Sequence, residues 1–471
     1  MSLNHHGKPS SRTIVLDRKP SRLLGVFLLA LTLLGVLPFR AVAEESEPRR
    51  RFPNVVLISI DTLRYDRLSI NGYRRPTSPR IDALLESGIR FDEARVPEAL
   101  TSPSMCSILT SLEPHEHGAS RNALPMRSQL PSMTTVLGQR GYKTAAFVGN
   151  WTLKDELTRL GEHFETYVEV LERKRYLGMV NAEATADDLN EKALEWVDQH
   201  LEDAAAWPFA LWVHYVEPHA PYMLHKDMAE RLGIKLREEL PPSDLYDTEV
   251  AFVDRATGQL IDALRERVPT EDLMILFVSD HGESLGEHGY WGHGRHVYDV
   301  TLRVPLGIAW PGKVPPGRIA GLASTLDLAP TVLGILGLRQ PESFQGFDWS
   351  PVIRGEMPEP ESRTTFHQGH KGAMHKKDAQ ARRDGLLEVG RVFDGKKEIL
   401  RLKGNRHQLF DLTADPYERK NRVKKSSPAS EELLAWLADV QRGLEAADSE
   451  PPPSLDAEAI EQLKALGYLD P

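Results

Sequence analysis

Four apolar, β-branched runs constrain the fold of this chain more than any other feature. They cover residues 54–60 (NVVLISI), 143–149 (KTAAFVG), 208–216 (PFALWVHYV) and 273–280 (LMILFVSD). A strand that is apolar on both sides has no face to present to water. Each run therefore predicts a central strand that is buried on both faces of a sheet.

Helical patterns separate these runs. Apolar residues recur at helical spacing over residues 78–88, 132–141, 189–201 and 247–268. Strands that alternate with helices predict an α/β sandwich with a large, mostly parallel central sheet. Ligands of such sheets bind beyond the carboxyl ends of the strands, so we searched those ends for functional residues.

The last quarter of the chain has a different character. The segment GRVFDGKKEILRLKGNRHQLFDLTADP shows short strand patterns with turns at Asp-Gly and Lys-Gly, which predicts a small antiparallel sheet. We expect a main α/β domain over residues 52–365, a small subdomain over 366–430 and a helical tail over 431–471. A proline-rich linker at 449–454 precedes the last helix.

The first 43 residues have the layout of a secretory signal peptide. A basic RKPSR precedes the apolar run LLGVFLLALTLLGVLPF, and small residues follow at Ala41 and Ala43. The alternative is an uncleaved anchor, because the run approaches the roughly 20 residues that span a bilayer. We favour cleavage after Ala43, which predicts a periplasmic or secreted protein, and we expect membrane attachment only if the segment is retained.

Charge and cysteine content exclude some functions. Without residues 1–43 the chain has 52 basic and 67 acidic residues, so its net charge changes from −10 to −15. Such a charge argues against nonspecific binding to nucleic acid or anionic lipid. Cys106 is the single cysteine, so no intramolecular disulfide can form, and the apolar pattern around it favours a small buried residue over a nucleophile.

Carboxylates and an imidazole lie at two strand ends. Asp61 ends the first run, Asp280 ends the last, and His281 follows at once. A lone aspartate at a strand end is more often the cap of a turn. Two of them with a histidine form an oxygen and nitrogen ligand set for a divalent cation, and the imidazole favours zinc or manganese over calcium.

Further histidines lie in loops beside glycine and proline. They are His214 and His219 in HYVEPHAPY, and His288, His293 and His296 in GEHGYWGHGRH. We expect His219 and His293 to reach the strand-end cleft, with His214 as the second choice. Others of the five are expected to be solvated or hydrogen-bonded surface residues.

Hydroxyl side chains precede a predicted helix at SMCSILTSL. Thr101 opens a loop that turns at Pro103 before this helix. A hydroxyl near the free N–H groups of a helix N-terminus lies where phosphate or sulfate would bind. The local pattern alone favours a simpler role, in which Thr101, Ser102 or Ser104 is the N-cap.

The ordered series of segments resembles the sulfatase family of the alkaline phosphatase superfamily. The resemblance runs from about residue 53 to 422 and rests on NVVLISIDTLRYDRL, RPTSPRIDALLESGIRFDEAR, TSPSMCSILTSLEPHEHG, HYVEPHAPY, SDHGESLGEHGYWGHG, LRVPLGIAWPG, TLDLAPTVLGILGL and HQLFDLTADPYERKN. It implies the fold of that superfamily, a divalent metal, and hydrolysis of a sulfuric or phosphoric ester.

The chain departs from the family at the nucleophile. The family signature is Cys or Ser, any residue, Pro, Ser or Ala, then Arg, and it aligns with residues 101–105, TSPSM. In the family the first residue is oxidised to formylglycine. Threonine is not a substrate for that oxidation and Cys106 is out of register, so we expect no formylglycine and take Thr101 as the nucleophile.

Other departures point in the same direction. The family's Arg is Met105, its second Asp is Thr62, and its GKWH segment aligns with GNWT, which places Asn150 and Thr152 at the Lys and His positions. The remaining set resembles threonine-dependent relatives such as nucleotide pyrophosphatase/phosphodiesterases and phosphoethanolamine transferases.

The resemblance also implies roles for individual residues. It assigns the metal to Asp61, Asp280, His281 and the Thr101 oxygen. It assigns contacts with the transferring group or the leaving oxygen to Asn150, His219 and His293. In sulfatases, His219 matches an oxyanion-binding His and His293 matches a substrate-binding Lys.

The function implied is that of an exported, metal-dependent hydrolase of a small-molecule, glycan-linked or lipid-linked anionic ester. Two alternatives stay open: a transferase that moves a phosphoryl head group in the cell envelope, and a binding protein on a sulfatase scaffold. Specificity is expected from the loops at 172–188 and 366–385, the second of which is locally basic.

Overall fold

The computed structural model describes residues 52–171, 184–202, 208–372, 385–424 and 427–446, together with Ala457 and Ile460. The predicted signal peptide, the linker at 449–454, nearly all of the last predicted helix and parts of both predicted specificity loops lie outside these residues. Among the described residues, no helix is both long enough and apolar enough to cross a bilayer.

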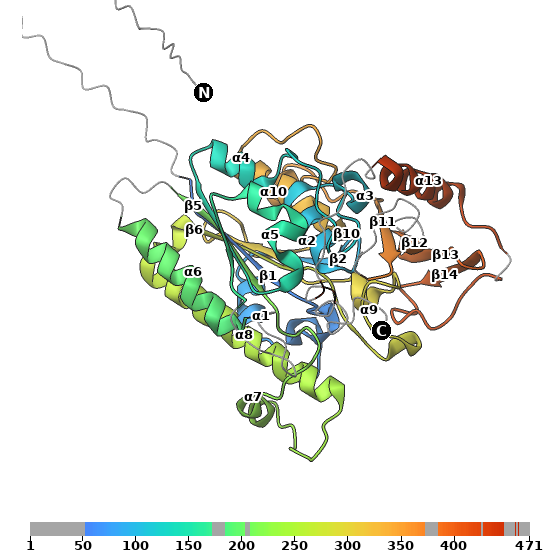
Figure 1. The fold of residues 1–471 in the computed structure, drawn as a ribbon, viewed down its shortest axis with the longest axis horizontal. Coiled ribbons are helices and arrows are strands. Elements are labelled where there is room, and N and C mark those ends of the chain that lie inside the picture. The colour runs from blue at the N-terminus through green and yellow to red at the C-terminus, as the bar shows by residue number, and fades with distance from the viewer. Residues whose placement is uncertain are drawn as a thin grey trace, which may run out of the picture. The chain divides into compact units, whose positions relative to one another are not determined.

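An eight-stranded sheet forms the centre of the molecule (Figure 1). Its spatial order is β10 (Gly317–Ser324), β2 (Ile89–Arg95), β9 (Leu306–Ala309), β6 (Leu273–Ser279), β1 (Asn54–Ile60), β5 (Phe209–Tyr215), β3 (Lys143–Val148) and β4 (Thr166–Glu169). β9 is antiparallel to both of its neighbours, and the other pairings in the sheet are parallel. The predicted large, mostly parallel sheet is confirmed.

The four predicted runs became β1, β3, β5 and β6, four adjacent strands that include the middle of the sheet. Side chains of β1 alternate between two cores: Val55 and Leu57 belong to one, Val56 and Ile58 to the other. Both faces are therefore buried, as unbroken apolar sequence requires. The sequence analysis did not identify β2, β9 and β10, and the outer strand β10 alternates irregularly between exposed and buried residues.

Helices cover both faces of the sheet (Figure 1). One layer contains α1 (Pro79–Glu86), α6 (Ala186–Leu201) and α8 (Pro242–Arg267), and α7 (Lys226–Arg231) packs against α8. The other contains α2 (Thr101–Thr110), α4 (Met133–Gln139) and α10 (Leu328–Leu336). Short helices in the connections are α3 (Pro114–His117), α5 (Asp155–Thr158), α9 (Asp299–Leu302) and α11 (Ser350–Ile353).

A second sheet follows the central one. It is antiparallel and has the order β11 (Thr364–His370), β12 (Leu386–Phe393), β13 (Lys396–Arg401) and β14 (Arg406–Asp411). The predicted Asp-Gly turn joins β12 to β13, and both Asp394 and Gly395 have positive φ, as a two-residue hairpin turn requires. The helix α13 (Glu431–Ala446) packs on this sheet and on α3. The fold class predicted from the sequence is confirmed.

A buried group of charged residues, which we call the ionic cluster, joins the two sheets. Asp299 accepts from the guanidinium of Arg95 at 2.7 Å and also pairs with the Lys397 ammonium, which lies 2.9 Å from Glu418. Arg95 ends β2 and Lys397 lies on β13. These four residues, Arg95, Asp299, Lys397 and Glu418, are largely or fully buried and fix the small sheet against the loops that carry the candidate site.

Candidate active site

Two carboxylates leave the centre of the sheet side by side. β1 and β6 are parallel neighbours, and Ile60 pairs with Ser279, so Asp61 and Asp280 are the next residues in register. Both side chains are fully buried. The alternation of strands and helices predicted a site at this edge, and the register of β1 with β6 is what brings these two acids together.

Each carboxylate has one bonded oxygen and one without a partner. Asp280 Oδ1 accepts from the Thr62 and His281 backbone N–H groups at 3.0 and 2.7 Å, and Asp61 Oδ2 accepts from Asn150 Nδ2 at 2.5 Å. Asp61 Oδ1 and Asp280 Oδ2 are buried and accept no hydrogen bond. Buried anionic oxygens without partners are costly, so this pair fits a bound cation.

The third member is His281, and its tautomer is set by the backbone. Nδ1 lies 2.9 Å from the carbonyl oxygen of Gly282, so Nδ1–H donates and Nε2 presents a lone pair. Nε2 is 3.8 Å from Asp61 Oδ1 and 3.5 Å from Asp280 Oδ2. The atoms that a cation would contact therefore face one another.

Backbone geometry supports this arrangement on both sides. A Cβ at Gly282 would lie 2.3 Å from the Val300 carbonyl oxygen, so only glycine lets the loop after His281 approach that segment. Thr62, directly after Asp61, has φ 55°. A left-handed threonine costs about 1–3 kcal/mol and is found mostly where a site demands it.

Thr101 lies at the start of α2, with its hydroxyl Oγ1 3.4 Å from His281 Nε2. The sequence placed Thr101 in a loop before the helix, and this was wrong, because α2 begins at Thr101 itself. Pro103 is tolerated inside the first turn, where its missing N–H would have had no partner in the helix.

The expectation that a hydroxyl caps α2 was also wrong. The N-cap is Leu100, and no side chain caps the helix. Ser102 Oγ donates to the Thr152 carbonyl oxygen and Ser104 Oγ to the Asp280 carbonyl oxygen, both at 2.6 Å. These serines attach α2 to the two loops, and the Thr101 hydroxyl is left facing His281.

Cys106 lies on α2 within the apolar core. It is fully buried, and burial raises the pKa of its thiol far above the ordinary range. A protonated thiol in an apolar core is unsuited to nucleophilic attack.

His214, the second choice from the sequence, also approaches the two carboxylates. It lies on β5, paired in register with Ser59, and its Nε2 is 3.8 Å from Asp61 Oδ2. One ligand atom each from Asp61, His214 and Asp280 lies within 4.8 Å of the others. Distance alone would therefore admit His214 as a metal ligand.

The rings of His219 and His293 lie next to that of His281. Their ring centroids are 5.2 Å apart, and the ring of His293 is 4.3 Å from that of His281. His293 Nδ1 lies 3.3 Å from the buried carboxylate of Glu283. The sequence analysis missed Glu283, although its position two residues after His281 in SDHGE was a signal for it.

The other two loop histidines lie elsewhere. His288 stacks on Tyr298 at 3.7 Å between ring centroids, and His296 Nδ1 pairs with Glu388 at 2.7 Å. His288 lies between the short strands β7 (Ser284–Leu285) and β8 (Trp291–Gly292), and His296 follows β8 and pairs with a residue of β12 in the small sheet.

The pKa values of the two acids shift in opposite directions. Burial acts to raise the pKa of Asp61, but His219, His214 and His281 lower it below its usual range. Burial and the neighbouring Asp61 charge raise the pKa of Asp280 well above its usual range. Two buried carboxylates this close resist carrying two negative charges together.

The pKa values of two histidines, His281 and His293, also shift in opposite directions. Burial, and then the nearby His293, lower the pKa of His281 well below its usual range. The Glu283 carboxylate outweighs burial and raises the pKa of His293. Within this group, His281 is thus the neutral ring and His293 the one that is more readily protonated.

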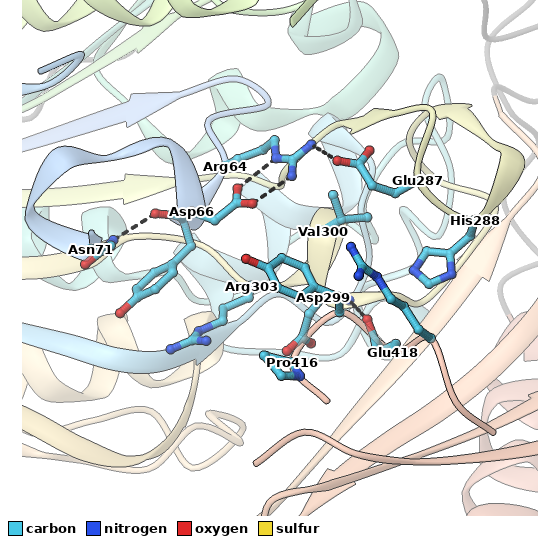
Figure 2. A pocket seen from close by; sticks show the side chains of 13 residues that line it. Arg64, Asp66, Asn71, Glu287, His288, Asp299, Val300, Arg303, Pro416 and Glu418 are labelled. Atoms are coloured by element: carbon cyan, nitrogen blue, oxygen red, sulfur yellow. Dashed lines mark hydrogen bonds and ion pairs between the residues drawn. The ribbon is translucent and has the colours of Figure 1, made fainter. Parts of the chain in front are cut away.

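A cavity of about 530 Å³ is lined by residues that include Arg64, Asp66 and Glu287 (Figure 2). Arg64 lines it and binds Asp66 and Glu287, each at 2.8 Å. Arg64 also donates to the Glu283 carbonyl oxygen at 3.1 Å. The lining residues do not include the strand-end acids or histidines, so this cavity is separate from the site.

Two family models match the sequence of this chain. "Sulfatase" matches residues 53–338, and "N-sulphoglucosamine sulphohydrolase, C-terminal" matches residues 286–442. The first covers all the site residues described above. The second covers the small sheet and most of α13.

Curated relatives are similar over most of their length. A choline-sulfatase of Rhizobium meliloti is 25% identical, with 83% of this chain and 86% of the relative covered. Human arylsulfatase A is 25% identical, with 83% and 87% covered. An N-acetylglucosamine-6-O-sulfatase of Bacteroides thetaiotaomicron is 23% identical, with 87% and 90% covered.

Solved structures share the fold. One, a complex with the substrate D-glucosamine-2-N,6-O-disulfate, has a TM-score of 0.66 at 19% identity and covers 86% of this chain and 100% of the other. A phosphonate monoester hydrolase of Agrobacterium radiobacter has a TM-score of 0.62 at 20% identity, with 84% and 96% covered.

Proposed function

Because this chain belongs to the sulfatase family and is therefore a hydrolase of ester bonds, we propose that it cleaves a sulfate or phosphate ester with Thr101 as nucleophile. A divalent cation would be held by Asp61, Asp280 and His281 together with the Thr101 oxygen. The substrate is proposed to be an anionic ester of a small molecule or glycan, the class that the names of the relatives print.

One observation carries the proposal. The hydroxyl of Thr101 faces the Nε2 lone pair of His281, which lies within 4 Å of two carboxylate oxygens that have no other partner. A bound cation would offset charge on the transferring group and lower the pKa of a hydroxyl beside it. The oxygen and nitrogen donors suit zinc or manganese.

The bond changes balance with residues of this chain and one water molecule. Thr101 Oγ1 forms a bond to sulfur or phosphorus as the bond to the alcohol oxygen breaks, and the alcohol leaves with a proton. Water then cleaves the threonine ester and releases sulfate or phosphate. His293, whose Nδ1 lies 3.3 Å from Glu283, and the adjacent His219 are the proposed proton donors for the leaving oxygen.

Asn150 is proposed to act through Asp61. The resemblance assigned it a contact with the transferring group, but its Nδ2 donates to Asp61 and its Oδ1 accepts from the Thr152 N–H and hydroxyl. Both ends of the amide are therefore engaged inside the protein. Its second N–H can still reach an oxygen of the substrate.

Export is a separate proposal. It rests on the basic, apolar and small-residue order of residues 1–43. Sequencing of the mature N-terminus should give Glu44. A mature chain that starts at Met1 would contradict cleavage and would favour the membrane-attached transferase.

The test compares 4-nitrophenyl sulfate, 4-nitrophenyl phosphate and bis(4-nitrophenyl) phosphate as substrates, with the metal content of the same samples measured. Thr101→Ala should lower kcat by about 1,000-fold or more, as loss of a nucleophile does. Thr110→Ala is the matched control, because this threonine ends the same helix and bonds only to the Cys106 carbonyl oxygen. The relative rates on the three esters decide between sulfate and phosphate.

Three outcomes would contradict the proposal. Equal activity in wild type and Thr101→Ala would remove Thr101 from the reaction. Loss of activity in Cys106→Ala, with formylglycine in the peptide that contains this residue, would restore the usual family nucleophile. Protein without bound metal and without turnover on any ester would favour the binding protein.

A further inference from the structure

His214 presents a question that distance cannot answer. Its Nε2 lies near Asp61 and Asp280 as a metal ligand would, yet Nε2 can act as a ligand only if it carries no proton. The hydrogen bonds on the other side of the ring determine where that proton is.

A buried chain of hydrogen bonds reaches the ring from the core. Trp212 Nε1 lies 2.7 Å from Ser59 Oγ, and Ser59 Oγ lies 2.8 Å from His214 Nδ1. Indole N–H can only donate, so Ser59 accepts from Trp212. The hydroxyl hydrogen of Ser59 then needs an acceptor, and His214 Nδ1 is the one that the structure offers.

The direction of this chain fixes the tautomer of His214. If Nδ1 accepts from Ser59, the proton of the neutral ring is on Nε2. The reverse assignment would leave the hydroxyl hydrogen of Ser59, a fully buried residue, without an acceptor and would turn the Nε2 lone pair toward the Asp61 carboxylate. Nε2–H therefore faces Asp61 Oδ2 at 3.8 Å, an electrostatic contact that is too long for a hydrogen bond.

Asp61 Oδ2 is the oxygen that already accepts from Asn150. One oxygen of Asp61 thus faces two donors, Asn150 and His214, while Oδ1 faces His281 and has no hydrogen-bond partner. Such an arrangement turns the carboxylate so that a single oxygen is presented to a cation.

We propose that His214 is a positioning residue and not a metal ligand: Trp212 and Ser59 hold it in the Nε2–H tautomer, and it orients Asp61 for the cation. This inference rests on the proposed metal site. It names residues to which the family resemblance gave no role, Ser59 and Trp212, and it excludes the ligand that proximity suggests.

The decisive measurement is made on the wild-type protein. Histidine ¹⁵N NMR of the protein, metal-free and loaded with Zn²⁺, reports the protonation of each imidazole nitrogen, and His214→Gln assigns the signal. We expect His214 to keep its proton on Nε2 in both states and His281 to have a bare Nε2. Loss of the Nε2 proton of His214 on Zn²⁺ binding would overturn the proposal.

Variants give a second readout through the affinity for Mn²⁺. His214→Ala should weaken Mn²⁺ binding by about 10–100-fold, the range for partners of ligands, without changing the stoichiometry. His214→Gln, whose amide N–H can replace Nε2–H, should recover most of the affinity. Ser59→Ala should weaken binding less than His214→Ala.

The matched control is a buried serine and histidine pair outside the site. Ser107 Oγ lies 3.0 Å from His117 Nε2, and both residues are fully buried. Ser107→Ala should leave the Mn²⁺ affinity unchanged. An equal loss in Ser107→Ala and Ser59→Ala would overturn the inference, because general softening of the core would then explain both.

The two proposals can fail separately. If no divalent cation binds and no ester is turned over, the proposed function fails. If Mn²⁺ binds and Thr101-dependent turnover is present but His214→Ala has wild-type affinity, only the positioning role fails.

Discussion

The strand-end site and the ionic cluster are two buried groups of acids in one molecule, and they are neutralised differently. In the ionic cluster, Asp299 contacts the side chains of Arg95 and Lys397. At the strand ends, Asp61 and Asp280 contact histidines, amide donors and each other, and an oxygen of each has no partner.

The pKa values of the acids follow this difference. Burial alone would raise the pKa of Asp299, but Arg95 and Lys397 hold it well below its usual range. Asp280, with Asp61 in place of a cation beside it, has a pKa well above its usual range. A buried acid with its own cations belongs to the structure, whereas a buried pair without them provides a site for a metal.

The first way to break this comparison is Asp299→Asn. Removal of the Asp299 charge leaves two buried cations, Arg95 and Lys397, with only Glu93 and Glu418 as counter-charges, so we expect a loss of about 3–5 kcal/mol in the free energy of unfolding, measured by urea titration. Asp262→Asn is the control, because this acid pairs with Arg80 at an exposed position and should change stability by less than about 1 kcal/mol. Equal effects would show that burial does not distinguish the pairs.

The second is Asp280→Asn. We expect kcat/KM to fall by at least about 100-fold, because even partners of metal ligands cost 10–100-fold. The metal-free variant should be no less stable than the metal-free wild type, since repulsion from Asp61 is removed. A variant that loses stability as Asp299→Asn does would place Asp280 among the structural acids.

The third way to break the comparison is to remove any bound cation with a chelator and then to add it back. A ligand that binds only the folded state stabilises it by RT ln(1 + [L]/Kd), which is about 1.4 kcal/mol at ten times Kd. Addition of Zn²⁺ or Mn²⁺ to chelator-treated protein should raise the unfolding midpoint, and Asp280→Asn should abolish that increase. An increase that persists in the variant would indicate a cation site elsewhere.

A pH dependence within the ionic cluster is also expected. Burial raises the pKa of Glu418 to about 7, with Lys397 opposing and Asp299 assisting the shift. Because this folded-state pKa exceeds the unfolded value of about 4.3, the Glu418 contribution is present below pH 4.3 and is lost as the pH rises to 7. The stability of wild type relative to Glu418→Gln should fall over that window by at most about 1.4 kcal/mol per pH unit. A rise in the stability of wild type relative to Glu418→Gln over the same pH window would contradict this prediction.

Much of the architecture could be predicted because the signals are local. Unbroken apolar runs identified four central strands, and the Asp-Gly turn identified a hairpin. The start of α2 could not be predicted, since its N-cap is an apolar leucine and its first turn contains a proline. The serines that were expected to cap α2 form hydrogen bonds with loops that are distant in sequence. These partners are set by tertiary contacts.

The sequence by itself determined the chemistry available: strand-end acids, a following histidine, loop histidines, and the threonine that we propose as the nucleophile. Only the tertiary structure decided which atoms of these residues are free. The pairing of β1 with β6 places Asp61 beside Asp280, and their hydrogen bonds leave one oxygen of each without a partner. A chain from Trp212 through Ser59 sets the tautomer of His214. Hydrogen-bond partners come from strands up to 218 residues apart, and no local pattern records them.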